Sequence, residues 1–334
     1  MPNRGLRTLR AIDLACAVLV IVGAVRLFAL VLHMPLLGYA NQYDMARSSA
    51  CVDLWPALPS PARYAAHQAA PLPRYEVEHV PGGPCYPSSV LAFVELAKGG
   101  VTALRWAWLI RGRSFPLQAV GIAEAVALIA LMLAFIRAER DRPRARLAHA
   151  ALFALILSDP AMALWMNTLY TEFATIFFAY ATGGLLALAP GKRMPVASTI
   201  GSDGRMPAAI AIDSVRRIPV ASDGEPIRHR GYLFSVMWIG ALAGLAWSRQ
   251  QYAAFVFVPL LIAAPQWWRC ARGGWFTAVI VLIASVAMQA SFMAGLPAVR
   301  AANDHDFYLG AVLPAARNED AALTRLGLPH ACRA

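Results

Sequence analysis

The stretch Leu14–Leu32 reads LACAVLVIVGAVRLFALVL and contains one charged residue, Arg26. A helix of about 20 apolar residues is long enough to cross the ~30 Å hydrocarbon core of a bilayer. The basic segment before it would also fit a secretory signal peptide, but this apolar run is longer than such a peptide needs and contains an arginine. We therefore expect an uncleaved membrane-spanning helix at this position.

Six further apolar runs follow along the chain. The second of these six would be the third span, and Asp159-Pro160 interrupts it. Hydrophobic residues make up 59% of the chain and charged residues 15%, with a mean hydropathy of +0.52. A soluble domain would carry about 25% charged residues. The sequence therefore predicts an all-α polytopic membrane protein of about seven transmembrane helices. The six later runs are Leu117–Ile136, Leu147–Trp165, Phe173–Ala189, Tyr232–Trp247, Ala253–Trp267 and Trp275–Leu296.

Arginine and lysine gather in alternate segments between these runs, which predicts the orientation. Positive residues are enriched in cytoplasmic segments. The distribution of positive residues therefore predicts a cytoplasmic N-terminus and an extracytoplasmic C-terminus. The expected location is the plasma (inner) membrane, as a multi-pass protein. The net charge of +11 comes with no basic stripe or recognition motif, so the bilayer, not nucleic acid, is the expected partner. The inner basic residues are Arg4, Arg7, Arg10, Arg137, Arg140, Arg142, Arg144, Arg146, those between Lys192 and Arg230, Arg269 and Arg272.

On this topology the chain divides into four parts. Residues 1–190 form an N-terminal membrane module whose long outer loop covers residues 35–116. Residues 191–230 are rich in glycine, proline and serine, which predicts a disordered cytoplasmic linker. Three further transmembrane helices occupy residues 231–297, and residues 298–334 form an outer tail.

The outer loop contains two apolar helical runs, Ser88–Leu96 and Val101–Ile110. The second carries two tryptophans flanked by arginines, a composition typical of a helix that lies in the lipid headgroup plane. We expect the loop to form a small cap on the membrane. Cys51 and Cys85 lie in this loop, where a disulfide and two free thiols are both open interpretations.

Charged residues inside apolar spans require a reason, because they are costly in a bilayer. Arg26 and Glu124 lie at similar depth below the outer surface, which predicts an ion pair between the first and second spans. A role in substrate binding is the alternative. Asp159 is expected to cap the helix that begins at Pro160, since proline suits the first helical position.

Three further groups of polar residues lie on the predicted outer side. The first group contains Asp44, an acid able to accept a proton or hold a cation. An arginine in the third group could bind an anionic lipid phosphate or be merely solvated. The groups are Asn41, Asp44 and Arg47; Asn167, Tyr170 and Glu172; and Arg249 with Gln251.

The segment Asn303-Asp304-His305-Asp306 brings two carboxylates and an imidazole within four positions. No ligand spacing typical of a metal site is satisfied there. We therefore interpret it as a solvated loop and predict no metal site.

Several short patterns, in order along most of the chain, resemble a family of bacterial GT-C fold membrane glycosyltransferases that transfer hexoses in cell-surface glycan synthesis. Each pattern is short, and their order along the chain strengthens the resemblance. They are Asn41-Gln42-Tyr43-Asp44-Met45, similar to Asn-Asn-Gly-Asp-Phe; Tyr86-Pro87-Ser88-Ser89; Asn167-Thr168-Leu169-Tyr170-Thr171-Glu172, similar to Asn-Ser-Phe-Tyr-x-Glu; Ser248-Arg249-Gln250-Gln251, similar to Ser-Lys-x-Gln; and the tail from Leu313 to Pro329.

The resemblance implies transfer of a hexose from a polyprenyl-phosphate carrier to a glycan or lipid acceptor on the extracytoplasmic face. Asp44 would be the general base, with Glu172 as a second catalytic carboxylate, and Arg249 would bind the donor phosphate. No cofactor is implied beyond the lipid-linked donor, and a divalent cation is compatible with the chemistry. The remaining substrate-binding residues would be Asn41, Arg47, Asn167, Tyr170 and Gln251.

The chain departs from the family pattern at Tyr43, Met45 and Arg249. Family members usually continue into several more spans, so the expectation is a shortened or divergent member. Two other classes stay open: a polytopic transporter or lipid flippase, and a non-catalytic subunit of a glycan assembly complex. A transporter would usually show repeats between its halves, and none is found.

Overall fold

The structure, a computed structural model, is mainly helical in the part of the chain that it describes. Helices account for 74% of the described residues, in agreement with the predicted helical class. The described residues are 3–39, 45, 48–57, 72–78, 85, 87–109, 111–112, 114–188, 224–248, 256, 258–262, 272–294 and 318–326.

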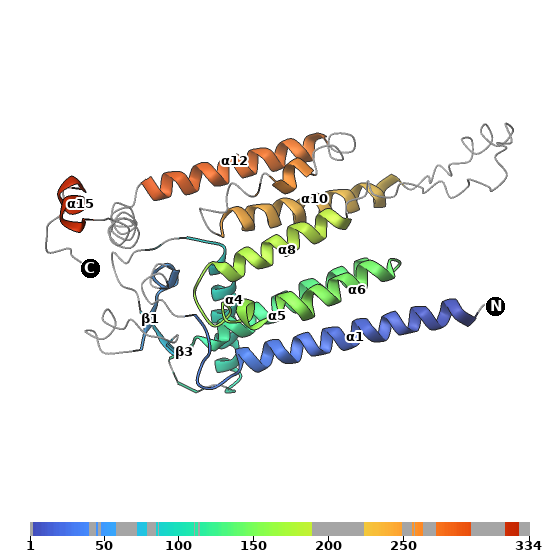
Figure 1. Ribbon diagram of the computed structural model, residues 1–334, viewed down its shortest axis with the longest axis horizontal. Coiled ribbons are helices and arrows are strands. Elements are labelled where there is room, and N and C mark those ends of the chain that lie inside the picture. The colour runs from blue at the N-terminus through green and yellow to red at the C-terminus, as the bar shows by residue number, and fades with distance from the viewer. Residues whose placement is uncertain are drawn as a thin grey trace.

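The long helices lie side by side and roughly parallel (Figure 1). Each overlaps one of the apolar runs, because a continuous apolar run satisfies its backbone hydrogen bonds within a helix. The predicted linker ends earlier than expected, since the fifth of these helices already begins at Gly224. These helices are α1 (Asn3–Val31), α5 (Gln118–Ala138), α6 (Pro143–Leu152), α8 (Glu172–Leu188), α10 (Gly224–Ala246) and α12 (Arg272–Ala294).

Two helical stretches in the described part of the chain, Arg10–Val31 and Gln118–Ala138, are long and apolar enough to cross a membrane. Shorter apolar helical stretches cover Glu172–Leu188, Phe234–Ala246 and Phe276–Met288. The prediction of seven spans is therefore not confirmed. The first helix is exposed along much of its apolar surface, including Leu14, Ile21 and Val25.

The third predicted span is broken where the sequence indicated. After α6 the chain forms a π-helical turn, Phe153–Leu157, and then the short helix α7, Pro160–Ala163. Oδ1 of Asp159 accepts a hydrogen bond from the amide of Ala161 at 3.0 Å. The capping prediction for Asp159 is confirmed, because its side chain accepts from an amide in the first turn of α7.

The described part of the outer loop forms a cap that contains strands as well as a helix. A three-stranded antiparallel sheet has the order β1 (Leu54–Pro56), β2 (Arg74–Val77), β3 (Phe115–Pro116). The all-α expectation missed these strands, because strands this short carry too little alternation to be recognised. A 3-10 turn, Ala50–Val52, precedes β1.

One continuous helix, α4 (Val90–Trp106), replaces the two shorter helical runs predicted in the loop. It runs across the end of the parallel helices that lies nearest the sheet (Figure 1). Trp106 and Trp108 stay exposed, at 82% and 87%. Cys51 and Cys85 are joined by a disulfide. Of the two interpretations that the sequence left open, the disulfide is therefore the correct one.

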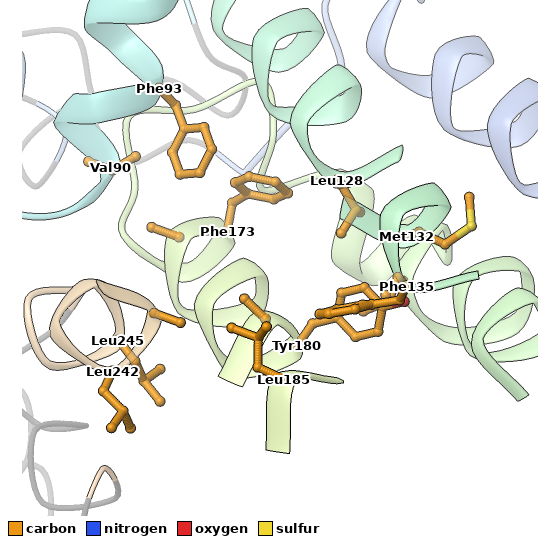
Figure 2. Close-up of a cluster of buried hydrophobic side chains, with 14 of the residues drawn as sticks. Val90, Phe93, Leu128, Met132, Phe135, Phe173, Tyr180, Leu185, Leu242 and Leu245 are labelled. Carbon is orange, nitrogen blue, oxygen red and sulfur yellow. The ribbon is translucent and has the colours of Figure 1, made fainter. Parts of the chain in front are cut away.

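Two hydrophobic cores hold these parts together. The larger core joins the parallel helices, and Figure 2 shows Phe93 of α4 pointing toward Phe173 of α8. Leu242 and Leu245 of α10 belong to the same core. The smaller core lies under the cap and includes Tyr75, Val94 and residues at the start of α5. The cap is thus packed onto one end of the helices. A short helix in the C-terminal tail, α15, covers Glu319–Leu326.

Candidate functional site

Half of the predicted site residues can be located. The others lie outside the described residues; they are Asn41, Asp44, Arg47, Arg249 and Gln251. Of those described, Asn167, Tyr170 and Glu172 lie between α7 and the first turn of α8, at the cap end of the helices (Figure 1).

Asn167 joins the third predicted span to the end of the first. Its Nδ2 donates to the carbonyl of Val31 at 3.2 Å and to the carbonyl of Leu37 at 2.8 Å. Gln118 Nε2 also donates to Val31 O, at 3.0 Å. The Asn167 side chain is 1% exposed, and a Cβ at Gly121 would overlap its Oδ1. Asn167 therefore positions backbone at this end of the protein, a structural task in addition to any substrate contact.

Tyr170 follows in an aromatic group on the same segment. Its ring lies edge-on to Trp165, with centroids 5.3 Å apart, and Trp165 contacts Tyr39 at 4.2 Å. The backbone amide of Tyr39 donates to Leu164 O at 3.2 Å. These contacts bring the start of the outer loop against the segment that precedes α8.

Glu172 is the first residue of α8, where a carboxylate interacts favourably with the helix dipole. One turn later, Thr175 Oγ1 donates to Ser248 Oγ at 2.8 Å. The amide of Ser89, just before α4, donates to Trp247 O at 3.1 Å. The N-terminal ends of α4 and α8 thus meet the C-terminal end of α10.

Unsatisfied polar atoms mark this junction. Among the described residues the hydroxyls of Ser88 and Ser89, at the start of α4, find no hydrogen-bond partner. Oδ1 of Asn167 has none either, but it faces Gly121 of α5 and not the junction. Buried polar atoms are nearly always hydrogen-bonded, so groups of this kind call for an explanation such as a polar ligand. Sequence reasoning had noted Ser88 and Ser89 only through the family resemblance, and it missed Thr175.

Two further residues connect the junction to segments near those that are not described. Met45, which follows Asp44 in the sequence, is 1% exposed and belongs to the same buried cluster as Leu169. Ser248 precedes Arg249 and is fully buried. Chain neighbours of the predicted base and of the predicted phosphate-binding arginine therefore lie beside the segment that carries Glu172.

The predicted ion pair between Arg26 and Glu124 is wrong. Nη2 of Arg26 contacts Oδ2 of Asp159 at 2.7 Å instead. Glu124 is fully buried in α5, and neither of its carboxyl oxygens has a hydrogen-bond partner in the described structure. A similar distance along two spans does not determine a pair, because the rotation of each helix about its axis also decides which side chains meet. Here α1 also packs against α7, which brings Asp159, the N-cap residue of α7, to Arg26.

This pairing predicts energetic coupling between Arg26 and Asp159. Arg26→Gln and Asp159→Asn each remove a charge, and asparagine keeps the capping oxygen. Because both side chains are partly exposed, we expect a coupling of about 0.5–1 kcal/mol in a double-mutant cycle. Thermal unfolding in detergent measures it. The matched cycle of Arg26→Gln with Glu124→Gln should be additive, and the opposite pattern would restore the original pairing.

No group of three or more histidine, cysteine, aspartate or glutamate side chains that could hold a metal ion occurs within the described residues. The comparisons with known proteins add no candidate chemistry, since no family model, curated protein or solved structure matches the chain.

Proposed function

We propose that the chain is a multi-pass membrane glycosyltransferase of the GT-C type. It would transfer a hexose from a polyprenyl-phosphate carrier to a glycan or lipid acceptor at the extracytoplasmic end of its helices. The observation that carries the proposal is the meeting of three distant segments at one end of the helices. They are marked by Met45, by the turn from Asn167 to Glu172, and by Ser248.

The membrane setting is supported by the surface of the helices. Besides the two stretches long enough to cross a bilayer, α12 exposes large apolar side chains such as Ile280 and Ile283. An exposed apolar surface of this extent is unfavourable in water. Seven spans with a cytoplasmic N-terminus would place the cap, and the junction below it, on the extracytoplasmic side.

The proposed chemistry assigns a role to each group at the junction. The acceptor hydroxyl loses a proton as it attacks the anomeric carbon, and Asp44 accepts that proton. The polyprenyl phosphate of the donor leaves as an anion, which Arg249 stabilises. Glu172 holds the acceptor or sugar hydroxyls, together with Tyr170, Asn41, Arg47 and Gln251.

The whole-chain test is a transfer assay in membranes that contain the expressed protein. A radiolabelled polyprenyl-phosphate hexose is added, and label is followed from the donor into glycan or glycolipid. Membranes without the protein serve as the control. Label that stays on the donor, for every polyprenyl-phosphate hexose supplied, would overturn the proposal and favour a non-catalytic subunit.

Glu172→Gln is expected to lower the transfer rate about tenfold. The change removes a charged acceptor but keeps the size of the side chain, and a charge-assisted hydrogen bond contributes about 1.5–3 kcal/mol. The same assay measures the rate. Asp141→Asn removes one exposed carboxylate from the turn between α5 and α6, outside the junction, and should leave the rate unchanged. An equal loss in both variants would contradict the assigned role.

A second candidate, a transporter, is favoured by one observation. The Arg26–Asp159 ion pair adjoins a π-helical turn and a helix break within the predicted spans. Charged pairs and broken helices at membrane depth are features of transport pathways. Uptake or flipping of a labelled lipid-linked sugar in proteoliposomes, without any change in its covalent structure, would distinguish this activity from transfer.

A further inference from the structure

A cavity of about 710 Å³ lies in the cap, apart from the junction at Glu172. Its volume is within the range of sites that hold small molecules, about 300–1,000 Å³. The cavity lies along the C-terminal half of α4, about 18 Å along that helix from Val90, where α4 meets the junction. Its lining residues are Glu76, Val77, Lys98, Val101, Thr102, Arg105, Gly112, Ser114 and Phe115.

One wall of the cavity is a single face of α4. Lys98, Thr102 and Arg105 follow one another at helical spacing, so they project to the same side. Lys98 Nζ donates to Glu95 Oε1 at 2.9 Å and to Val52 O at 3.0 Å. Arg105 Nη2 donates to Ser114 O at 2.8 Å. Both cations are therefore held in defined positions at the wall and not left as mobile surface side chains.

The other walls come from the sheet and the turn before β3. Glu76 of β2 contributes a carboxylate, and Ser114 contributes a hydroxyl close to Arg105. Val101 and Phe115 form an apolar floor, where Phe115 is only 1% exposed. A ring buried to that extent offers no face on which a base could stack, which argues against a nucleotide.

The charges on these walls select a class of ligand. Lys98 is ion-paired with Glu95, whereas Arg105 donates to the neutral carbonyl of Ser114, so Arg105 is the main cation at this wall. Such a cation disfavours a cationic ligand and suits a carboxylate or phosphate. Glu76 and the hydroxyls of Thr102 and Ser114 suit a ligand that also carries hydroxyl groups. An anion attached to a polyhydroxylated ring meets both requirements, whereas an apolar ligand or a bare inorganic anion meets only one.

We propose that this cavity binds an anionic sugar unit, with Arg105 and Lys98 on its acidic group and Glu76 on its hydroxyls. That this unit belongs to the acceptor rests on the transferase activity proposed above. In that case the acceptor is an acidic oligosaccharide that extends along α4 to the junction. The affinity of the cavity for anionic sugars does not depend on the transfer reaction.

Ligand-observed NMR titration of the full chain in detergent tests this binding, with D-glucuronate, D-glucose 6-phosphate, D-glucose and inorganic phosphate as probes. We expect the two anionic sugars to bind at least tenfold more tightly than glucose, since a charge-assisted hydrogen bond contributes about 1.5–3 kcal/mol. Phosphate should bind more weakly than glucose 6-phosphate. Equal affinity for glucose and glucuronate would overturn the proposal, and equal affinity for phosphate and glucose 6-phosphate would overturn its sugar component.

Variants separate the cavity from general charge effects. Arg105→Gln should weaken glucuronate binding about tenfold, whereas Arg111→Gln, which removes the same charge from an exposed residue outside the lining, should not. Because Arg105 also supports Ser114, a second change is made at the exposed Thr102. Thr102→Lys should strengthen binding and Thr102→Glu should weaken it, and unchanged affinity in both would contradict the site.

The binding measurement also distinguishes this inference from the proposed function. Asp44→Asn should bind glucuronate as tightly as the unaltered chain. If binding follows the expected pattern while no transfer is found, the cavity stands and the transferase proposal fails. If transfer occurs but the anionic sugars do not bind, the cavity assignment fails alone.

Discussion

Asp44→Asn is expected to lower the rate of hexose transfer by about 10²–10⁴-fold, the usual contribution of a positioned general base. Asparagine has nearly the size of aspartate but cannot accept the proton that the acceptor hydroxyl loses. The transfer assay in membranes measures the rate. Because the change acts on the chemical step, a loss in kcat with little change in the KM for the donor is the expected pattern.

The control for this experiment is Asp304→Asn, which removes a carboxylate from the tail segment interpreted as a solvated loop. It should retain full transfer. Size-exclusion elution of both variants checks that each is folded. Full transfer by a folded Asp44→Asn protein would remove Asp44 from the role of base and leave Glu172 as the remaining candidate.

Asn167→Leu is expected to destabilise the protein by about 2–4 kcal/mol. The amide of Asn167 donates to two backbone carbonyls, and Leu37 O would lose a donor in a partly buried setting. An unsatisfied buried polar group costs about 1–3 kcal/mol, and the second hydrogen bond adds about 1 kcal/mol. Thermal unfolding in detergent, followed by helical circular dichroism, measures the loss as a lower Tm.

Gln118→Leu provides the graded comparison. Within the described residues the side chain of Gln118 donates to Val31 O, which also accepts from Asn167, so this change leaves that carbonyl with a donor. We expect a cost of about 1 kcal/mol or less. Equal losses in the two variants would show that Asn167 does not carry the connection between the first and third segments.

The local elements were predictable because their causes lie close together in the sequence. The apolar run that begins at Leu14 is helical to Val31, and the hydrogen bonds of a helix join residues only four positions apart. Asp159 and Pro160 are adjacent, so the cap and helix start follow from two neighbouring residues. The strands of the cap escaped prediction, because each is only two to four residues long and is stabilised by pairing with distant segments.

Prediction of the site was limited by the same cause, because its contacts join residues that are distant in the sequence. Sequence order alone could not say that Ser248 lies against Thr175, nor that Ser88 and Ser89 contribute hydroxyls to the same place. Those contacts depend on how three helices pack, which involves residues more than seventy positions apart. The disulfide between Cys51 and Cys85 is a similar case, since spacing in the sequence permits either interpretation.

The sequence by itself determined that this protein is built from long apolar helices and, for α5, α8 and α12, where they begin and end to within three residues. It also determined the break at Asp159, because propensity, capping and hydrophobic length act between near neighbours. Only the tertiary structure decided that Arg26 pairs with Asp159 and not with Glu124, and that the cap contains a sheet and a cavity. Helix rotation and strand pairing are set by packing between distant residues, which no local pattern specifies.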